Sequence, residues 1–383
     1  MRSLWLAGFR PFFALACLSG LSLPVLWALM FAGAIEAPAA AFTGIQWHAH
    51  EMFFGFGWAM LAGFLLTASK NWVKIRGYHG APLMFLAAAW CFERLGMGLG
   101  DGWPRPLFLL SNYLFLAAAV FMLLTTLVRH RATDSYRRDN TYFLVLLPLF
   151  LPAKFLLLDG IYGQAGQFMT LGLFRLAFLI MLERTLTDFM KGVFQAAILR
   201  HPLLDGLIKS LALALVFAGF LPPPAVACLA AALALLLAAR FAFWKPALGF
   251  SRIDIGIMYL GYLAIIAQLL VVAFEQAARL VWVGSVSIHL FTFGVMGLIT
   301  PAMILRISKG HTGRKVAFDA LDKAVLWLML LALVFRVLAP QLFPGAYLAW
   351  IAFSAACWFA AFAILAWRCI PFLLMPRVDG REH

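Results

Sequence analysis

Apolar runs of about twenty residues recur along the whole chain, and this recurrence limits the possible folds more than any other feature of the sequence. A helix needs ~20 apolar residues to cross the hydrocarbon core of a bilayer. Of the 383 residues, 64% are hydrophobic and 12% are charged, a ratio that a soluble domain cannot carry. The sequence therefore predicts an all-α, polytopic bundle of about twelve transmembrane helices: 12–35, 47–69, 82–100, 105–128, 140–158, 166–190, 203–221, 223–245, 255–275, 282–305, 318–338 and 346–370.

Basic residues gather in every second loop between these runs, and only Arg105 and Arg279 fall in the opposite loops. Loops rich in Lys and Arg stay on the cytoplasmic side of a membrane, so both termini are expected in the cytoplasm. The same placement accounts for the formal charge of +14, which makes the lipid bilayer the expected partner and argues against nucleic acid. Because no long polar stretch interrupts the runs, residues 1–383 are expected to form a single transmembrane domain.

Two of the predicted spans begin with the same pattern, H-x-x-x-F-G, which starts at His50 and again at His289. Ionisable side chains inside a membrane are costly, and they are taken as functional by default. If both helices run in the same direction, the two imidazoles lie at one depth with a small residue beside each. A metal or a haem held between two helices needs that arrangement. His50 and His289 are therefore candidate axial ligands of a haem b.

Other charged side chains fall in the same outer half of the predicted spans. The propionates of a haem need cations beside them in low dielectric, and a guanidinium pairs a carboxylate through two hydrogen bonds. Arg94, Arg175 and Arg336 are the candidates for this role. For each of them the alternative is an ion pair with an acid of the protein or a position at the membrane interface, and the neighbouring Glu93 offers Arg94 such a pair.

Two further histidines are candidate metal ligands. Residues two apart on a helix point about 200° apart, so His48 and His50 cannot share one metal there. Either His48 lies in an extended segment before the helix, where both rings could hold a copper, or it serves a different centre. His311 follows the tenth span and is a candidate for a second site, with a solvated loop histidine as the alternative. Metal-free buried histidines or a proton relay remain the alternative for His48, His50 and His289.

Several blocks of sequence resemble the NnrS family, and together they cover most of the chain. The blocks are Gly8–Phe13 (GFRPFF), His48–Phe56 (HAHEMFFGF), Gly63–Ala68 (GFLLTA) with Asn71 and Trp72, and His289–Gly297 followed by Gly310–Arg314 (GHTGR). The resemblance implies a haem- and copper-containing protein of the bacterial inner membrane, linked to the nitric oxide response and to denitrification. It also places His311 inside a family motif, which strengthens that residue as a metal ligand. Val73 departs from the pattern, where a threonine is expected.

With this resemblance, the leading hypothesis is a multi-pass haem–copper protein that binds nitric oxide and relieves nitrosative stress, with nitric oxide reduction as a potential activity. Glu51 and Glu93 are the candidate catalytic residues, as proton carriers. The chain has no electron-transfer motif, so an unknown electron donor must supply a reduction. The rival hypotheses are a twelve-span proton-coupled transporter and a sensor or assembly factor without turnover. An optical spectrum with metal analysis separates the haem protein from the transporter.

Overall fold

The structure, a computed structural model, describes residues 2–38, 42–278 and 280–381, so Arg279 of the charge argument lies outside the described residues. All regular elements in the described part of the chain are helices. The chain divides into two compact units, and each is described by itself. The first unit comprises Met1–Gly163, Met303–Ala317 and Trp358–His383, and the second comprises Gln164–Ala302 and Phe318–Cys357. The single domain expected from the sequence stays a prediction.

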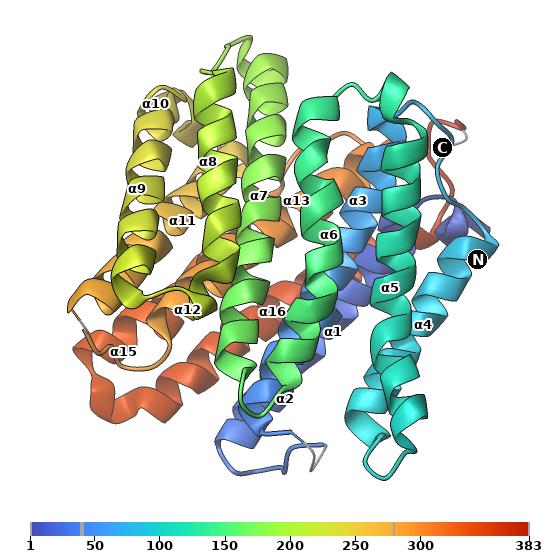
Figure 1. Cartoon of the computed structure of the whole chain (residues 1–383). Coiled ribbons are helices and arrows are strands. Elements are labelled where there is room, and N and C mark those ends of the chain that lie inside the picture. The colour runs from blue at the N-terminus through green and yellow to red at the C-terminus, as the bar shows by residue number, and fades with distance from the viewer. Residues whose placement is uncertain (1, 39–41, 279, 382–383) are drawn as a thin grey trace. The chain divides into compact units, whose positions relative to one another are not determined.

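The first unit contains the helices that open the chain and most of the helix that closes it (Figure 1). Helix α3 packs against α1 and α5, and α5 packs against α4 and α6. The elements of this unit are η1 (Arg2–Trp5), α1 (Phe9–Phe31), α2 (Gly44–His50), η2 (Glu51–Gly57), α3 (Trp58–Trp72), α4 (Ala81–Leu99), α5 (Arg105–Arg129), η3 (Arg131–Thr133), α6 (Arg137–Leu158), the end of α13 (Leu298–Gly310) and most of α16 (Tyr347–Leu374).

The second unit is built around α11, which packs against α9 and α12, while α8 packs on α9 and α14 packs on η5. Its elements are α7 (Gly163–Phe194), α8 (Pro202–Ala214), η4 (Leu215–Phe220), α9 (Pro223–Ala242), α10 (Pro246–Phe250), α11 (Ile253–Ala278), α12 (Val286–Phe291), η5 (Thr292–Gly297), the start of α13, α14 (Ala320–Leu333), η6 (Val334–Leu338), α15 (Ala339–Leu342), η7 (Pro344–Ala346) and the start of α16.

Eleven helical stretches in the described residues are long and apolar enough to cross a membrane. They coincide with eleven of the predicted spans; for example, the predicted span 105–128 is the helix Arg105–Arg129. Hydropathy alone places these helices because a bilayer leaves no water to satisfy exposed backbone groups, so each apolar run must satisfy its own within a helix. The prediction of an all-helical, multi-pass membrane protein is thereby confirmed.

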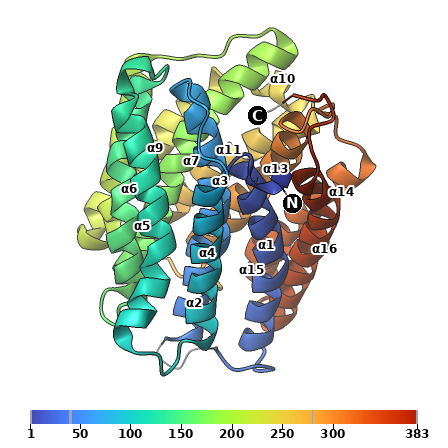
Figure 2. The same ribbon diagram turned by 90° about the vertical axis from the view of Figure 1, so that its right-hand side faces the viewer.

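The remaining predicted span, 82–100, is helix α4, which is not among the eleven because Glu93 and Arg94 lower its mean hydropathy. Helix α4 runs beside α5 in both views of the fold (Figures 1 and 2). Within the first unit, Arg10 at the start of α1 donates hydrogen bonds to the carbonyls of Leu373 and Met375 at the end of α16. The first and last spans therefore meet at one end, which requires an even number of crossings. A twelfth span at α4 agrees with this and stays a prediction. The cytoplasmic placement of that end stays a prediction.

A buried ionic network ties three helices of the second unit together. Glu183 on α7 accepts from Lys209 on α8 at 2.9 Å and from Arg240 on α9 at 2.8 Å. Arg240 also contacts Asp205 at 3.1 Å, and Arg200 contacts both carboxylates, at 2.5 Å to Glu183 and 3.0 Å to Asp205. Each carboxylate is shared by two or more cations, as buried charges require.

Candidate functional site

The first H-x-x-x-F-G segment begins at a capping box. The hydroxyl of Thr43 accepts from the backbone N–H of Gln46 at 3.2 Å, and the Gln46 side chain accepts from the backbone N–H of Thr43 at 3.1 Å. The helix has therefore begun at Gly44, and His48 lies inside it. The extended segment considered for His48 is wrong, and His48 and His50 lie on different faces. The His48 ring stacks on Trp27, with centroids 4.3 Å apart and planes at 16°.

Directly after His50 the helix widens into a π-helical segment, η2, before it continues as α3. The second motif segment does the same: His289 lies on α12, and the π-helical η5 follows. In both cases the Phe-Gly pair of the motif lies within the π segment. In the second case Pro301 adds a cause, because it has no N–H to bond the carbonyl four residues earlier. Short π segments inside α-helices are frequently found at functional sites.

His50 is fully buried, with both ring nitrogens in polar contact. Nδ1 lies 3.0 Å from Glu51 Oε1, and Nε2 lies 3.3 Å from the side-chain nitrogen of Asn112. The carboxylate of Glu51 accepts and the amide of Asn112 donates, so these partners assign the neutral Nδ1–H tautomer with an unprotonated Nε2. Glu93 Oε1 lies 3.4 Å from Nε2, so a proton added at Nε2 would face this carboxylate.

Around His50, two carboxylates and two cations balance one another inside the first unit. Glu93 Oε1 contacts Lys154 Nζ at 2.5 Å and Arg94 Nη2 at 2.6 Å, and Glu51 Oε2 contacts Arg94 Nε at 3.1 Å. The contacts of Arg94 are ionic, since none of its N–H groups is directed at an acceptor in the described residues. Arg94 thus takes the alternative considered for it, an ion pair with protein acids, and its pairing with a propionate stays a prediction.

Two buried groups of this cluster were not anticipated from the sequence. Asn112 on α5 contacts the His50 ring, and its backbone carbonyl accepts from Lys154 Nζ. Trp90 on α4 donates from Nε1 to the carbonyl of Gly55 at 3.0 Å and lies under the guanidinium of Arg94. The one available signal was an amide inside a long apolar run, which gives Asn112 a polar group that must find a partner.

His289, in the second unit, is held at both ring nitrogens by different groups. Nδ1 lies 2.7 Å from the backbone carbonyl of Ser285, and Nε2 lies 3.1 Å from Arg336 Nη2. A carbonyl only accepts and a guanidinium only donates, so these contacts also assign the neutral Nδ1–H tautomer. Arg336 lies on a third π-helical segment, η6, and its Nη1 donates to the hydroxyl of Tyr347 at 3.2 Å. A metal-ligating histidine typically has this arrangement, with its other nitrogen donating to a carbonyl or carboxylate.

The remaining arginine predicted at the site, Arg175, lies on α7 in the second unit. Its side chain is buried, and Nη1 donates to the side-chain oxygen of Gln268 at 3.1 Å. No carboxylate in the described part of the chain forms an ion pair with it.

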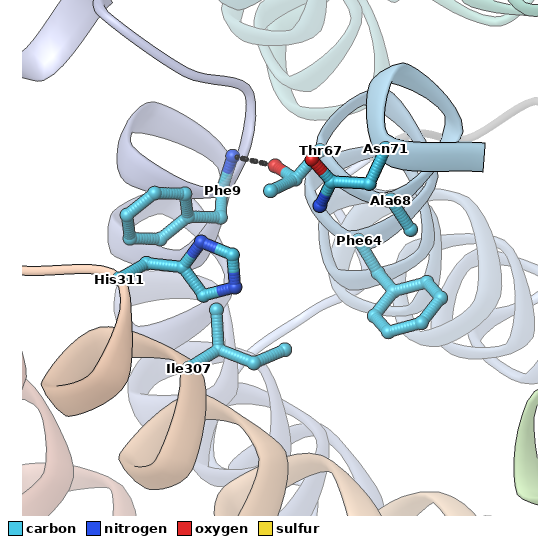
Figure 3. Close-up of a pocket in the computed structure, with 7 residues that line it drawn as sticks. All are labelled: Phe9, Phe64, Thr67, Ala68, Asn71, Ile307 and His311. Carbon is cyan, nitrogen blue, oxygen red and sulfur yellow. Dashed lines mark hydrogen bonds between the residues drawn. The ribbon is translucent and has the colours of Figure 1, made fainter. Parts of the chain in front are cut away.

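His311 lines a cavity of about 70 Å³ in the first unit, between the ends of α3 and α13 and the start of α1 (Figure 3). The Phe9 and His311 rings lie 5.4 Å apart, and the backbone N–H of Phe9 donates to the hydroxyl of Thr67 at 2.8 Å. Burial and the positive charges of Lys70, Arg377 and Arg10 lower the pKa of His311 from its ordinary value of 6.5 to about 4. His311 is thus half-buried and neutral rather than a solvated loop residue.

Among the described residues, no group of three or more His, Cys, Asp or Glu side chains is placed so as to hold a metal ion. The structure gathers His50, Glu51, Glu93 and Arg94 in one cluster of the first unit, and it places His289 beside Arg336 in the second. His48 and His311 each lie apart from that cluster, in separate surroundings of the first unit.

No curated protein matches the sequence. The family model described as NnrS protein matches residues 3–377, which is nearly the whole chain. The chain therefore belongs to the NnrS family. Membership supports the association with the nitric oxide response, and with haem and copper, that the sequence motifs implied.

Proposed function

We propose that this chain is a haem–copper protein of the bacterial inner membrane that binds nitric oxide and relieves nitrosative stress, with reduction of the bound molecule as its reaction. The observation that carries the proposal is the matched state of the two motif histidines. His50 and His289 both hold Nδ1–H against an oxygen acceptor, and both leave Nε2 as a lone pair facing a side-chain donor. A neutral imidazole with its tautomer fixed in this way is suited to bind a haem iron.

The donor groups at the two histidines fit a haem. Haem, when bound, would supply an iron that takes up nitric oxide. His50 and His289 are each candidates to ligate a haem iron through Nε2, after the amide of Asn112 has moved aside at His50 or the guanidinium of Arg336 at His289. Arg336 is then well placed for a propionate, because it lies beside His289 and has no carboxylate partner in the described residues. Arg94 and Arg175 are kept as further candidates for this role.

Copper is also proposed, and its support from the described residues is weaker. His48 and His311 are the candidate copper ligands of the first unit, and the ring of each packs against an aromatic side chain. A nitrogen ligand suits copper, but a stable site needs more than one. The ligands that complete such a site are left to metal analysis of the variants below.

Reduction of nitric oxide consumes protons and electrons, and the carboxylates of the first unit are suited to handle the protons. Glu93 Oε1 is held by Lys154 and Arg94, whereas its Oε2 is buried with no hydrogen-bond partner in the described residues. That oxygen would take up a proton and deliver it to the bound molecule beside His50, whose ring lies 3.4 Å from Oε1. Glu51 would hold the ring by accepting from Nδ1 throughout. An unidentified electron donor completes the proposal.

Three single variants test the assignment through the optical spectrum and the metal content of the purified protein. His50→Ala and His289→Ala are each expected to abolish the haem Soret band or shift it to that of a high-spin haem. His48→Ala is expected to spare the haem and to lower the copper content, because His48 lies on another face of its helix. Loss of haem from His48→Ala alone, with the other two variants unaffected, would contradict the proposal.

One observation favours a second function, a proton-coupled transporter. The buried group of His50, Glu51, Glu93 and Lys154 is the kind of ionisable chain that lines proton paths in membrane proteins. A transporter of this kind has no Soret band before or after any of the three substitutions. A sensor or assembly factor that holds haem would instead show the Soret band in the wild type but no consumption of nitric oxide.

A further inference from the structure

Arg175 is a buried cation for which the described protein provides no counter-charge. Its side chain is 4% exposed, near the middle of the span Gly163–Phe194. Its polar contact is the neutral amide of Gln268, and its Nε has no hydrogen-bond partner in the described residues. Every other deeply buried cation described above is matched by a carboxylate or by two carbonyls, so Arg175 stands out.

The carboxylates on the helices around Arg175 are engaged with other groups. Glu183 on α7 binds Lys209 and Arg240. On α11, Asp254 pairs with Arg252 at 3.0 Å, and Glu275 is hydrogen-bonded by the hydroxyl of Ser287. Asp188, near the end of α7, interacts electrostatically with Arg200 and Lys191. The neutralising charge for Arg175 is therefore not one of these acids.

A small enclosed space lies against Arg175 inside the second unit. The cavity has a volume of about 20 Å³ and is lined by the polar groups of Arg175, Gln268 and Ser287. The rest of its wall is apolar: Phe168 and Leu171 on α7, Leu215 and Ala218 on η4, Val272 on α11 and Ile288 on α12. About 10–15 Å³ suffices for one water molecule, so this space holds a single particle of that size.

We propose that this cavity is a binding site for one small monovalent inorganic anion of the size of chloride, held by the guanidinium of Arg175 and the side-chain amide N–H groups of Gln268, with Ser287 in the cavity wall. A water molecule would satisfy the hydrogen bonds but leave the charge unbalanced, and a lone charge inside a membrane protein costs several kcal/mol. A guanidinium does not escape the cost by losing its proton. The anion site does not require a bound haem, and pairing of Arg175 with a propionate is the competing outcome of the test below.

Anion replacement in the purified, detergent-solubilised protein tests the proposal. Chloride and then bromide are titrated against gluconate, which is too large for the cavity, at constant ionic strength. The thermal unfolding midpoint of the wild type is expected to rise saturably, by a few degrees or so, because a ligand of the folded state stabilises it. In crystals grown with bromide, anomalous scattering is expected to place one ion among Arg175, Gln268 and Ser287.

Three variants separate this site from general salt effects. Arg175→Met, which removes the charge at similar volume, is expected to lose the halide response. Gln268→Glu supplies a carboxylate 3.1 Å from the guanidinium, and it is expected to lose the response while unfolding in gluconate as late as the wild type does in chloride. Arg184→Met removes the same charge from the same helix outside the cavity, and it is expected to keep the response.

Several outcomes overturn the proposal. A wild type without a saturable halide response overturns it, as does a response that survives in Arg175→Met. Crystals without bromide in the cavity overturn it as well. If Arg175→Met loses haem and the wild type shows no halide response, Arg175 pairs with a propionate instead, and the proposed function stands without the anion site.

Discussion

His50 and His289 share a sequence motif, a ring tautomer and a following π-helical segment, yet their surroundings differ in charge. His50 is fully buried, and the two acids beside it are matched by Arg94 and Lys154. His289 is half-buried, and the Arg336 beside it has no carboxylate partner in the described residues. The two motif segments therefore share the ring tautomer and the π-helical segment, whereas side chains from other helices determine the charges around each ring. The charges around His50 therefore balance, whereas the positive charge of Arg336 beside His289 is not balanced by a carboxylate of the described residues.

The largest expected effect on stability comes from removing one charge of the balanced cluster around His50. Lys154→Met leaves Glu93 buried without its shortest cation contact, and one partner lost from a buried pair costs about 3–5 kcal/mol of the free energy of unfolding. Unfolding in mild detergent measures the change. The double variant Lys154→Met/Glu93→Gln removes both charges and should recover most of the loss. If Lys154→Met were as stable as the wild type, Glu93 would not depend on Lys154 to balance its charge.

A third histidine, outside the spans, sharpens the comparison through pH. The pKa of His311 is lowered from 6.5 to about 4 by burial and by the cations Lys70, Arg377 and Arg10, so its neutral form is the folded one. Its contribution is fully present above pH 6.5, is lost as the pH falls towards 4, and amounts to about 1–3 kcal/mol. Unfolding of the wild type and of His311→Gln between pH 7 and pH 4 measures it. Parallel pH curves for the two proteins would contradict the assignment.

The π segment beside His50 can be tested by a single methyl group. A Cβ on Gly55 would overlap the guanidinium of Arg94, which Glu51 and Glu93 hold in place. Gly55→Ala should therefore cost about 1–3 kcal/mol of stability, as overpacking does. Gly98 on α4 has open space where its Cβ would lie, so Gly98→Ala is the matched control and should change stability by less than about 0.5 kcal/mol. Equal effects at both positions would show that Arg94 is free to move.

The smallest expected effect on stability is at His289 and Arg336. Arg336→Leu removes a hydrogen bond from a half-buried ring, which costs about 0.5–1.5 kcal/mol. Its effect on haem occupancy should be larger, with Arg336→Lys rescuing it in part, since lysine offers no two-pronged contact. Nitrogen chemical shifts should report the lost hydrogen bond at His289 Nε2 in Arg336→Leu, with Nδ1 still protonated against the Ser285 carbonyl, while those of His50 stay unchanged. Full haem content in Arg336→Leu would remove this arginine from the site.

The helices were predictable from the sequence because hydropathy is a property of each run by itself. The predicted span 203–221 and the observed helix Pro202–Phe220 differ by one residue at each end. The two motif histidines could be singled out as candidates because a polar group within an apolar run is conspicuous, and their role as ligands stays a prediction. Helix α4 shows the limit of this signal: Glu93 and Arg94, the acid and base predicted to belong to the site, also lower the hydropathy by which spans are recognised.

Contacts between helices were not predictable, because they depend on which faces meet. Nothing in the order of residues places Asn112 against His50 or Trp90 against Gly55. The position of His48 required the start of its helix, which depends on the capping box at Thr43 rather than on hydropathy. The π segments were also unpredictable, because a hydropathy pattern does not distinguish a π-helical turn from an α-helical one.

The π-helical segments have a consequence for the register of the spans that contain them. An α-helix turns by about 100° per residue, so one extra residue accommodated in a wider turn rotates everything beyond it by about that angle. A helical wheel drawn straight through Gly44–Trp72 therefore assigns the wrong face to either its first or its last turns. Deleting one residue between Glu51 and Gly57 would leave a regular span that still crosses the membrane, but with its two ends facing different partners.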